Sequence, residues 1–355
     1  MASFNKFVRP ETPTSGVITD RDLDIIEAIL RYRFSPTSQL IRLVGGNEDV
    51  TLRRLRRLWE KGLINRWAFP GIRAHSEFHY YLDSSEPVDL LIAHGRITEP
   101  HPSMLEEIRN NREKDYAAAA TRGQHMQLGF LQHSLMISRM HFMLEMASRQ
   151  SSESVRLDGW SQGGPLTGHK VLVPKIKVSR QGNDYFWEES DETERSPVEP
   201  DALFTLEFEG GRPNARKAHF FYEADRGTMN TTDMLKKLRA YYHFIKKQQR
   251  HRDAFGIHPV RAVLVETTNE ARARRLMELV HHPLLCGREE RAGLFWFTIS
   301  PLFTDTTRNR TTPSDRALPN FLESPGTLFT SIWALPDGSL HALADAENFQ
   351  PSKGL

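Results

Sequence analysis

Apolar residues recur at helical spacing in three short stretches near the start of the chain. They predict helices over residues 20–32, 35–44 and 48–61. Thr19 or Asp20 can cap the first helix, and a Ser-Pro pair suits the start of the second. The apolar positions of the third helix, which we expect to be buried, are Val50 or Thr51, Leu52, Leu55, Leu58 and Trp59.

Two β-rich runs, residues 63–69 and 77–82, follow the third helix and flank a Pro-Gly turn, which predicts a hairpin. Three short helices followed by a hairpin is the order of a winged helix-turn-helix. In a three-helix domain of this kind the third helix is the recognition helix, which enters the major groove of DNA. We therefore predict a winged helix-turn-helix domain over residues 1–90.

The polar face of the third predicted helix carries four arginines within five positions, which would repel one another on an isolated helix. Such a face suits DNA phosphates or guanine edges, and Arg73 in the hairpin turn suits a backbone or minor-groove contact. The alternative is a three-helix protein-binding module with a solvated arginine face. The four arginines are Arg53, Arg54, Arg56 and Arg57.

Beyond this domain the pattern of apolar and polar residues indicates first a connecting segment, then helices and then strands. Residues 91–127 predict a connecting helical segment. Residues 128–303 predict an α/β domain, and residues 304–355 predict a loop, a hairpin and a tail. The strands expected in the α/β domain are 155–160, 170–178, 200–208, 219–225, 260–266 and 293–300, and its later helices are 232–250 and 269–281.

A helix, three strands, a helix and a strand in this order resemble the core of the PD-(D/E)xK nuclease superfamily. Pro200-Asp201 opens one strand and Glu223-x-Asp225 ends the next, so adjacent strand ends can bring the carboxylates together. Asp201 and Glu223, with Asp225 as a third ligand, are the candidate catalytic and metal-binding residues for Mg²⁺ or Mn²⁺. The overall prediction is an α+β protein with a winged helix-turn-helix followed by a PD-(D/E)xK nuclease-like α/β domain.

The superfamily typically has a lysine two residues after the glutamate, where this chain has Asp225. Hydrolysis would then need a cation from elsewhere, and Arg226, Lys217 and Lys236 are the candidates. The alternative is an ion-pair network of Glu223, Asp225 and Arg226, with Thr228 capping the next helix. Whether the chain is an enzyme therefore stays open at this point.

The formal net charge is only +2, but charge is segregated along the chain. Residues 1–75 carry a net +5, residues 184–209 a net −9, and residues 212–252 a net +8. The acidic segment 184–199 predicts a mobile loop. The basic region predicts a second DNA contact through Arg226, Lys236, Lys237, Arg239, Lys246 and Lys247.

Composition excludes several classes of protein. No run approaches the ~18 consecutive apolar residues of a spanning helix, and the first residues lack a signal-peptide stretch, so we expect a cytoplasmic protein with no membrane contact. Cys286 is the single cysteine, which excludes a disulfide framework and a multi-cysteine zinc site. The chain has no Walker loop and no His-Glu-x-x-His motif, so nothing supports nucleotide hydrolysis or zinc protease chemistry.

The whole pattern resembles the replication-relaxation family of plasmids and other bacterial mobile elements, over roughly residues 18–300. The Glu-x-Asp-Arg-Gly-Thr element at 223–228 is the most specific part, and the family usually has aspartate at the position of Asp225. The matching pieces are 20–30, 52–64, 200–203, 222–228, 236–238 with Tyr241, 261–265 and 294–298. The resemblance implies DNA binding in plasmid replication, relaxation or mobilisation.

Three functions follow from these observations. The first is a protein that binds double-stranded DNA of a plasmid or other mobile element. The second is a divalent-metal-dependent DNA endonuclease that uses Asp201 and Glu223. The third is an adaptor that recruits a relaxase or replication protein, with the acidic segment 184–199 as its docking site.

Overall fold

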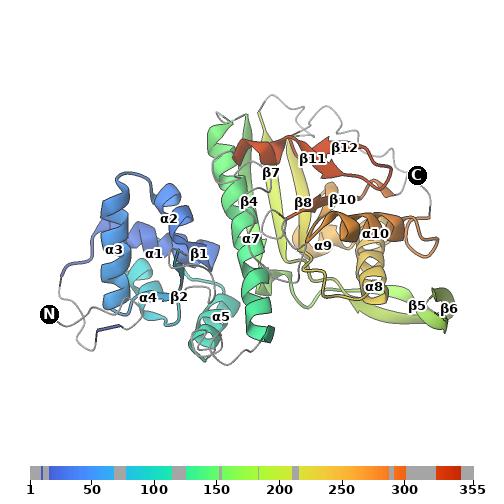
Figure 1. Ribbon diagram of the computed structural model, residues 1–355, viewed down its shortest axis with the longest axis horizontal. Coiled ribbons are helices and arrows are strands. Elements are labelled where there is room, and N and C mark those ends of the chain that lie inside the picture. Colours follow the sequence, from blue (N-terminus) through green and yellow to red (C-terminus); the bar gives the residue numbers. More distant parts are fainter. Residues whose placement is uncertain are drawn as a thin grey trace. The chain divides into compact units, whose positions relative to one another are not determined.

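The computed structural model (Figure 1) is a mixed α+β protein that divides into two compact units, Met1–Phe142 and Met143–Leu355. The division falls within the long helix α7 (His125–Gln150). The structure describes residues 9–10, 16–67, 77–113, 125–151, 154–182, 184–209, 216–287, 292–300 and 325–344. Arg73, predicted to contact DNA from the hairpin turn, lies outside these residues.

The first unit combines helices with a small antiparallel sheet whose strands lie in the order β1-β3-β2. Its elements are α1 (Asp20–Tyr32), β1 (Ser35–Pro36), α2 (Thr37–Val44), α3 (Glu48–Glu60), β2 (Asn65–Trp67), β3 (His79–Tyr81), α4 (Glu86–Ala93), α5 (Pro102–Glu113) and the first part of α7. The first and third helices begin where predicted, at Asp20 and Glu48. Thr19 forms a capping box with Asp22, and the Asn47 side chain accepts a hydrogen bond from the Val50 amide at 3.0 Å.

Two sequence predictions for this unit are wrong. Ser35 and Pro36 do not start the second helix, because their backbones pair with Tyr80 and His79 to form β1. Leu52 is not part of the buried stripe of α3. Its side chain is 39% exposed, because the stripe is centred on Leu55 and Leu58, both fully buried.

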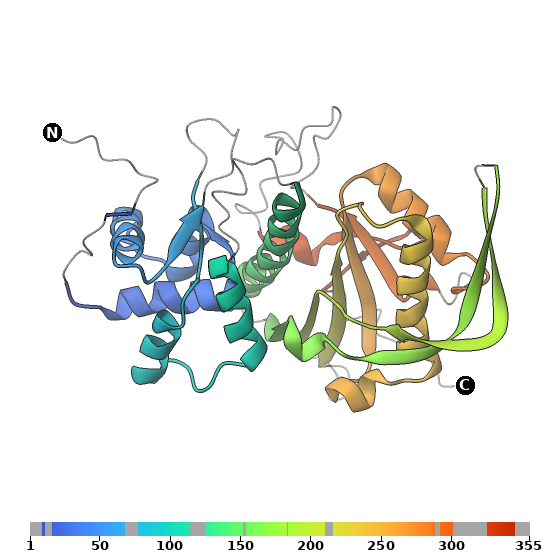
Figure 2. The same cartoon turned by 90° about the horizontal axis from the view of Figure 1, so that it is seen from below.

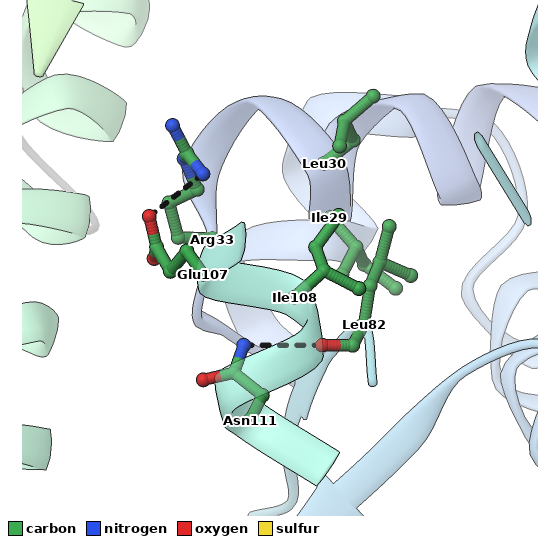
Figure 3. A pocket seen from close by; sticks show the side chains of 7 residues that line it. All are labelled: Ile29, Leu30, Arg33, Leu82, Glu107, Ile108 and Asn111. Atoms are coloured by element: carbon green, nitrogen blue, oxygen red, sulfur yellow. Dashed lines mark hydrogen bonds and ion pairs between the residues drawn. The ribbon is translucent and has the colours of Figure 1, made fainter. Parts of the chain in front are cut away.

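A strained turn links α1 to β1. Arg33 has a φ of +69° and a ψ of −63°, and the Phe34 amide donates to the Tyr32 carbonyl at 2.8 Å, which is the rare form of the γ-turn. The turn directs the Arg33 side chain to Glu107 of α5, 2.8 Å away, beside a small pocket (Figure 3). Across this pocket the Asn111 side-chain amide donates to the Leu82 carbonyl, so polar contacts fix α5 against the rest of the unit.

The second unit is built on a seven-stranded sheet in the order β12-β11-β10-β9-β8-β7-β4. Strands β4, β7 and β8 are antiparallel neighbours, β8, β9 and β10 are parallel, and β10, β11 and β12 are again antiparallel. The strands of this sheet are β4 (Val155–Gln162), β7 (Ala202–Phe208), β8 (Lys217–Ala224), β9 (Val260–Thr267), β10 (Phe295–Ile299), β11 (Ser331–Ala334) and β12 (Leu340–Ala342). The last two strands form the predicted C-terminal hairpin, which is therefore confirmed.

Helices α8 (Thr231–Tyr242) and α10 (Glu270–Val280) cover one face of this sheet (Figure 2). Phe221 of β8 and Val263 of β9 point into the apolar core that Leu238 and Leu276 supply from the helices. The helix predicted over 232–250 ends early. A π-helical turn (His243–Lys247) and the short α9 (His251–Phe255) follow α8 instead.

The acidic segment 184–199 is not a loop, which corrects the prediction. It forms β6 (Asp184–Pro197), which pairs with β5 (Lys170–Gln181) as a two-stranded antiparallel ribbon that Figure 2 shows in light green. The ribbon is fixed to the unit because Trp187 donates to Thr232 of α8 and the Glu189 carboxylate pairs with buried Arg239. Its acidic residues are therefore partly neutralised by basic neighbours.

Candidate functional site

The four arginines of α3 fall into two pairs with different roles. Arg54 lies 3.1 Å from the buried carboxylate of Asp22, and Arg56 lies 2.7 Å from Glu60 one turn further along the helix. Arg53 and Arg57 have no ion-pair partner among the residues that the structure describes. The spare positive charge of the helix therefore lies on these last two side chains.

A further arginine, which the sequence did not single out, holds the hairpin against α3. The Arg66 guanidinium of β2 lies 3.6 Å from the ring centre of Trp59 and 4.1 Å from that of Phe78. Guanidinium groups stack favourably on aromatic faces. Arg66 therefore fixes the position of β2 relative to α3.

A buried carboxylate lies at the end of β8 in the second unit. Both oxygens of Glu223 accept hydrogen bonds from α8, Oε2 from Lys237 Nζ and Oε1 from the Tyr241 hydroxyl. Asp201, just before β7, accepts a hydrogen bond on Oδ2 from the Ala224 amide at 2.8 Å. The antiparallel pairing of β7 with β8 thus brings Asp201 to the same strand end as Glu223, as the sequence predicted.

The protonation of this group is unusual. The pKa of Glu223 is raised to about 7, mainly because burial disfavours its charged form; the charge of Lys237 and the hydrogen bonds from Lys237 and Tyr241 oppose this rise, and the charge of Asp201 adds to it. Burial acts to lower the pKa of Lys237, but the carboxylates of Glu223, Asp201 and Asp225 outweigh burial and raise this pKa. Lys237 is therefore cationic at neutral pH beside a glutamate that titrates there.

Asp225 does not join Asp201 and Glu223, although the sequence predicted a three-carboxylate set. Its Oδ2 accepts from the Thr267 hydroxyl at 2.7 Å and from Arg272 Nε at 2.9 Å, and its Oδ1 accepts from the Gly227 amide at 3.0 Å. These donors turn the carboxylate toward β9 and α10. Among the described residues, no group of three or more His, Cys, Asp or Glu side chains is arranged to hold a metal ion.

The Glu-x-Asp-Arg-Gly-Thr element thus contributes to two separate side-chain clusters, one around Glu223 and one around Asp225. The predicted network of Glu223, Asp225 and Arg226 is wrong in its partners, because Lys237 and Arg272 provide the cations. Thr228 does not cap the next helix. That role belongs to Asn230, whose side chain accepts from the Asp233 amide at 2.9 Å.

The remaining predicted cations are dispersed. Lys236 is partly buried, and neither it nor Arg226 has an ion-pair partner within the described part of the chain. Lys217 lies at the other end of β8, where it contacts Asp158 at 2.7 Å. Arg239 is buried and donates to the Pro174 carbonyl at 2.6 Å and the Leu284 carbonyl at 2.8 Å, so it is not available to DNA.

Sequence reasoning placed Lys237 among the DNA contacts and missed its pairing with Glu223. The signal was present, because Lys237 and Tyr241 are four residues apart and therefore lie on one face of a helix. Cys286 is buried, as the sequence predicted. No described helix has both the length and the apolar content needed to cross a membrane.

The chain belongs to the replication-relaxation family, whose pattern it matches over residues 26–260. Membership suggests a role in the replication or relaxation of plasmids or other mobile elements, with DNA or replication-related partners. No curated protein and no solved structure matches the chain.

Proposed function

We propose that the protein binds double-stranded DNA of a plasmid or other mobile element through a winged helix-turn-helix in its first unit. The order α1-β1-α2-α3-β2-β3, with a β1-β3-β2 sheet, is the order of elements in a winged helix. In such domains the helix in the position of α3 enters the major groove. Family membership supports a DNA partner for this chain.

The observation that carries the proposal is the spare charge on α3. Asp22 and Glu60 neutralise Arg54 and Arg56, so Arg53 and Arg57 are the arginines of this helix that DNA phosphates or guanine edges can engage. They are four residues apart and therefore share one face of the helix. The Arg54 and Arg56 side chains form ion pairs within the unit, so removing them would affect folding as well as binding.

We expect the double variant Arg53→Ala, Arg57→Ala to bind a duplex at least about tenfold more weakly than the wild type, because each arginine makes a charge-assisted contact. The measurement is fluorescence anisotropy of a labelled duplex at moderate salt, with far-UV circular dichroism to verify folding. Arg109→Ala, at an exposed position on α5, is the matched control and should bind as the wild type does. Unchanged affinity of the double variant would overturn the proposal.

A second candidate function is divalent-metal-dependent cleavage of DNA, and the contact between Lys237 and Glu223 favours it. The order α7, β4, β7, β8, α8, β9 is the order of the PD-(D/E)xK core, and the lysine absent two residues after Glu223 is supplied from α8. Asp201 and Glu223 are suitable donors, because Mg²⁺ is usually bound by one or two carboxylates together with water and substrate phosphate.

The side chains of this site have distinct tasks in such a reaction. A bound Mg²⁺ or Mn²⁺ would neutralise the charge that develops on the phosphate and lower the pKa of an attacking water. Lys237 would hold its positive charge beside the attacking water and orient it toward the phosphorus. Tyr241 would fix the Glu223 carboxylate by its hydrogen bond, and the Ala224 amide does the same for Asp201.

We expect the wild-type protein to nick supercoiled plasmid in the presence of Mg²⁺ or Mn²⁺, and Glu223→Gln to slow nicking by about a hundredfold or more, because the variant loses a ligand charge. Gel electrophoresis of the plasmid over time measures this. Glu209→Gln, at an exposed position directly after β7, is the control and should leave the rate unchanged. A wild type that does not cleave, or cleavage that Glu223→Gln leaves intact, would exclude this function.

A further inference from the structure

One apolar side chain of α3 lies outside the buried stripe of that helix. Leu52 is 39% exposed, whereas Leu55 and Leu58 are fully buried and Trp59 is 3% exposed. Leu52 is the fifth residue of the helix, in its N-terminal half. That half of a recognition helix contacts base edges when the helix lies in the major groove.

The neighbours of Leu52 are polar and charged rather than apolar. Asp49 precedes it by one turn, and Arg53 and Arg56 follow it, and all three are exposed. The other large apolar side chains that are exposed in the described part of the first unit lie outside α3, at Val17, Ile92 and Phe130. Leu52 is therefore the most exposed apolar side chain in the N-terminal half of α3, within a charged surface that does not suit an apolar protein interface.

Three kinds of side chain on this surface, apolar, arginine and carboxylate, match different base edges in the major groove. Thymine is the base with a methyl group there, and it is recognised by apolar contact, as Leu52 could provide. Arginine pairs with the O6 and N7 acceptors of guanine, and a carboxylate accepts from the amino group of cytosine.

We propose that Leu52 is a specificity-determining residue that contacts the 5-methyl group of a thymine in the major groove. The proposal rests on the proposed DNA-binding function of α3 and adds the base that the helix reads. Arg53, the next residue, contacts the neighbouring backbone or a guanine edge. The preferred binding site of the protein therefore contains a thymine whose methyl group contributes to affinity.

The test removes the methyl group from the DNA and leaves the protein unchanged. The wild-type protein first selects bound duplexes from a random pool, and each thymine of the enriched site is then replaced in turn by deoxyuridine. We expect one such replacement to weaken binding by about threefold to fivefold, which corresponds to one lost buried methyl contact. Leu52→Ala should bind the thymine and deoxyuridine duplexes equally.

The matched control is Ile92→Ala, which removes a similarly exposed apolar side chain (42% exposed) from α4 and should keep the preference for thymine. An enriched site without any thymine effect overturns the role of Leu52, as does a thymine effect that persists in Leu52→Ala. Binding that enriches no site also overturns it, while duplex binding itself stands. A wild type that binds no duplex at moderate salt fails the proposed function itself, so the two failures are distinguishable.

Discussion

Replacement of Lys237 by methionine is expected to destabilise the second unit by about 3 kcal/mol at pH 8 and by much less at pH 5. Removing one partner of a buried ion pair leaves the other charge without compensation. Glu223 is buried, and its other direct donor is the neutral Tyr241 hydroxyl. At pH 8 the variant must either bury an unpaired carboxylate or take up a proton at a cost.

The pH dependence follows from the raised pKa of Glu223. This pKa is about 7 in the folded protein against an ordinary value of 4.5, so the folded state holds a proton that the unfolded state releases as the pH rises between these values. Stability from this group therefore falls as the pH rises. Loss of Lys237 removes an interaction that lowers the pKa of Glu223, and the fall then continues to higher pH.

Chemical denaturation at pH 5 and pH 8, monitored by tryptophan fluorescence, measures how much stability the Lys237→Met variant loses at each pH. Lys236→Met is the matched control, because it changes the same residue type one position earlier, where the structure describes no ion-pair partner. We expect this control to change stability by less than about 0.5 kcal/mol at either pH. Equal losses for Lys237→Met at both pH values, or a loss as large for Lys236→Met, would contradict the role of the pair.

Replacement of Arg272 by methionine is the second change with a large expected effect. It should lower the free energy of unfolding by about 3 kcal/mol. The Arg272 guanidinium donates to the buried Asp225 carboxylate and to the Met229 carbonyl at 3.0 Å, and the side chains of the ion pair are 9% and 4% exposed. The substitution leaves the Asp225 charge buried with only neutral donors. It also removes a link between the end of β8 and α10.

The same helix offers a control. Arg274 pairs with Glu270 one turn earlier, but both side chains are 68% exposed, and exposed pairs contribute little. Arg274→Met should therefore cost less than about 0.5 kcal/mol. Thermal unfolding of both variants measures the difference, and similar melting temperatures for Arg272→Met and the wild type would show that Asp225 does not depend on this arginine.

The parts of the fold that local chemistry determines were predictable from the sequence. The Thr19 and Asn47 caps define the starts of α1 and α3, and the strand that contains Glu223 ends at Ala224, within one residue of its predicted end. These features depend on side chains that hydrogen-bond within a few residues or on apolar spacing along one element. Such signals are visible in a single sequence.

The errors arose where distant residues decide the structure. The segment 184–199 has too many acidic residues to predict a strand by itself, and it becomes one because β5 pairs with it and Arg239 binds Glu189. Asp225 was expected to face a metal, but Arg272, 47 residues later, binds it instead. No local pattern contains these contacts, because each depends on the packing of separate elements.

The salt dependence of duplex binding tests most directly the claim that α3 contacts DNA. The logarithm of the binding constant should fall linearly with the logarithm of salt concentration, by about 0.9 for each phosphate contact. If Arg53 and Arg57 each contact a phosphate, we expect the double variant Arg53→Ala, Arg57→Ala to have a slope shallower than that of the wild type by about two. A slope that is the same for both proteins would contradict this account of α3.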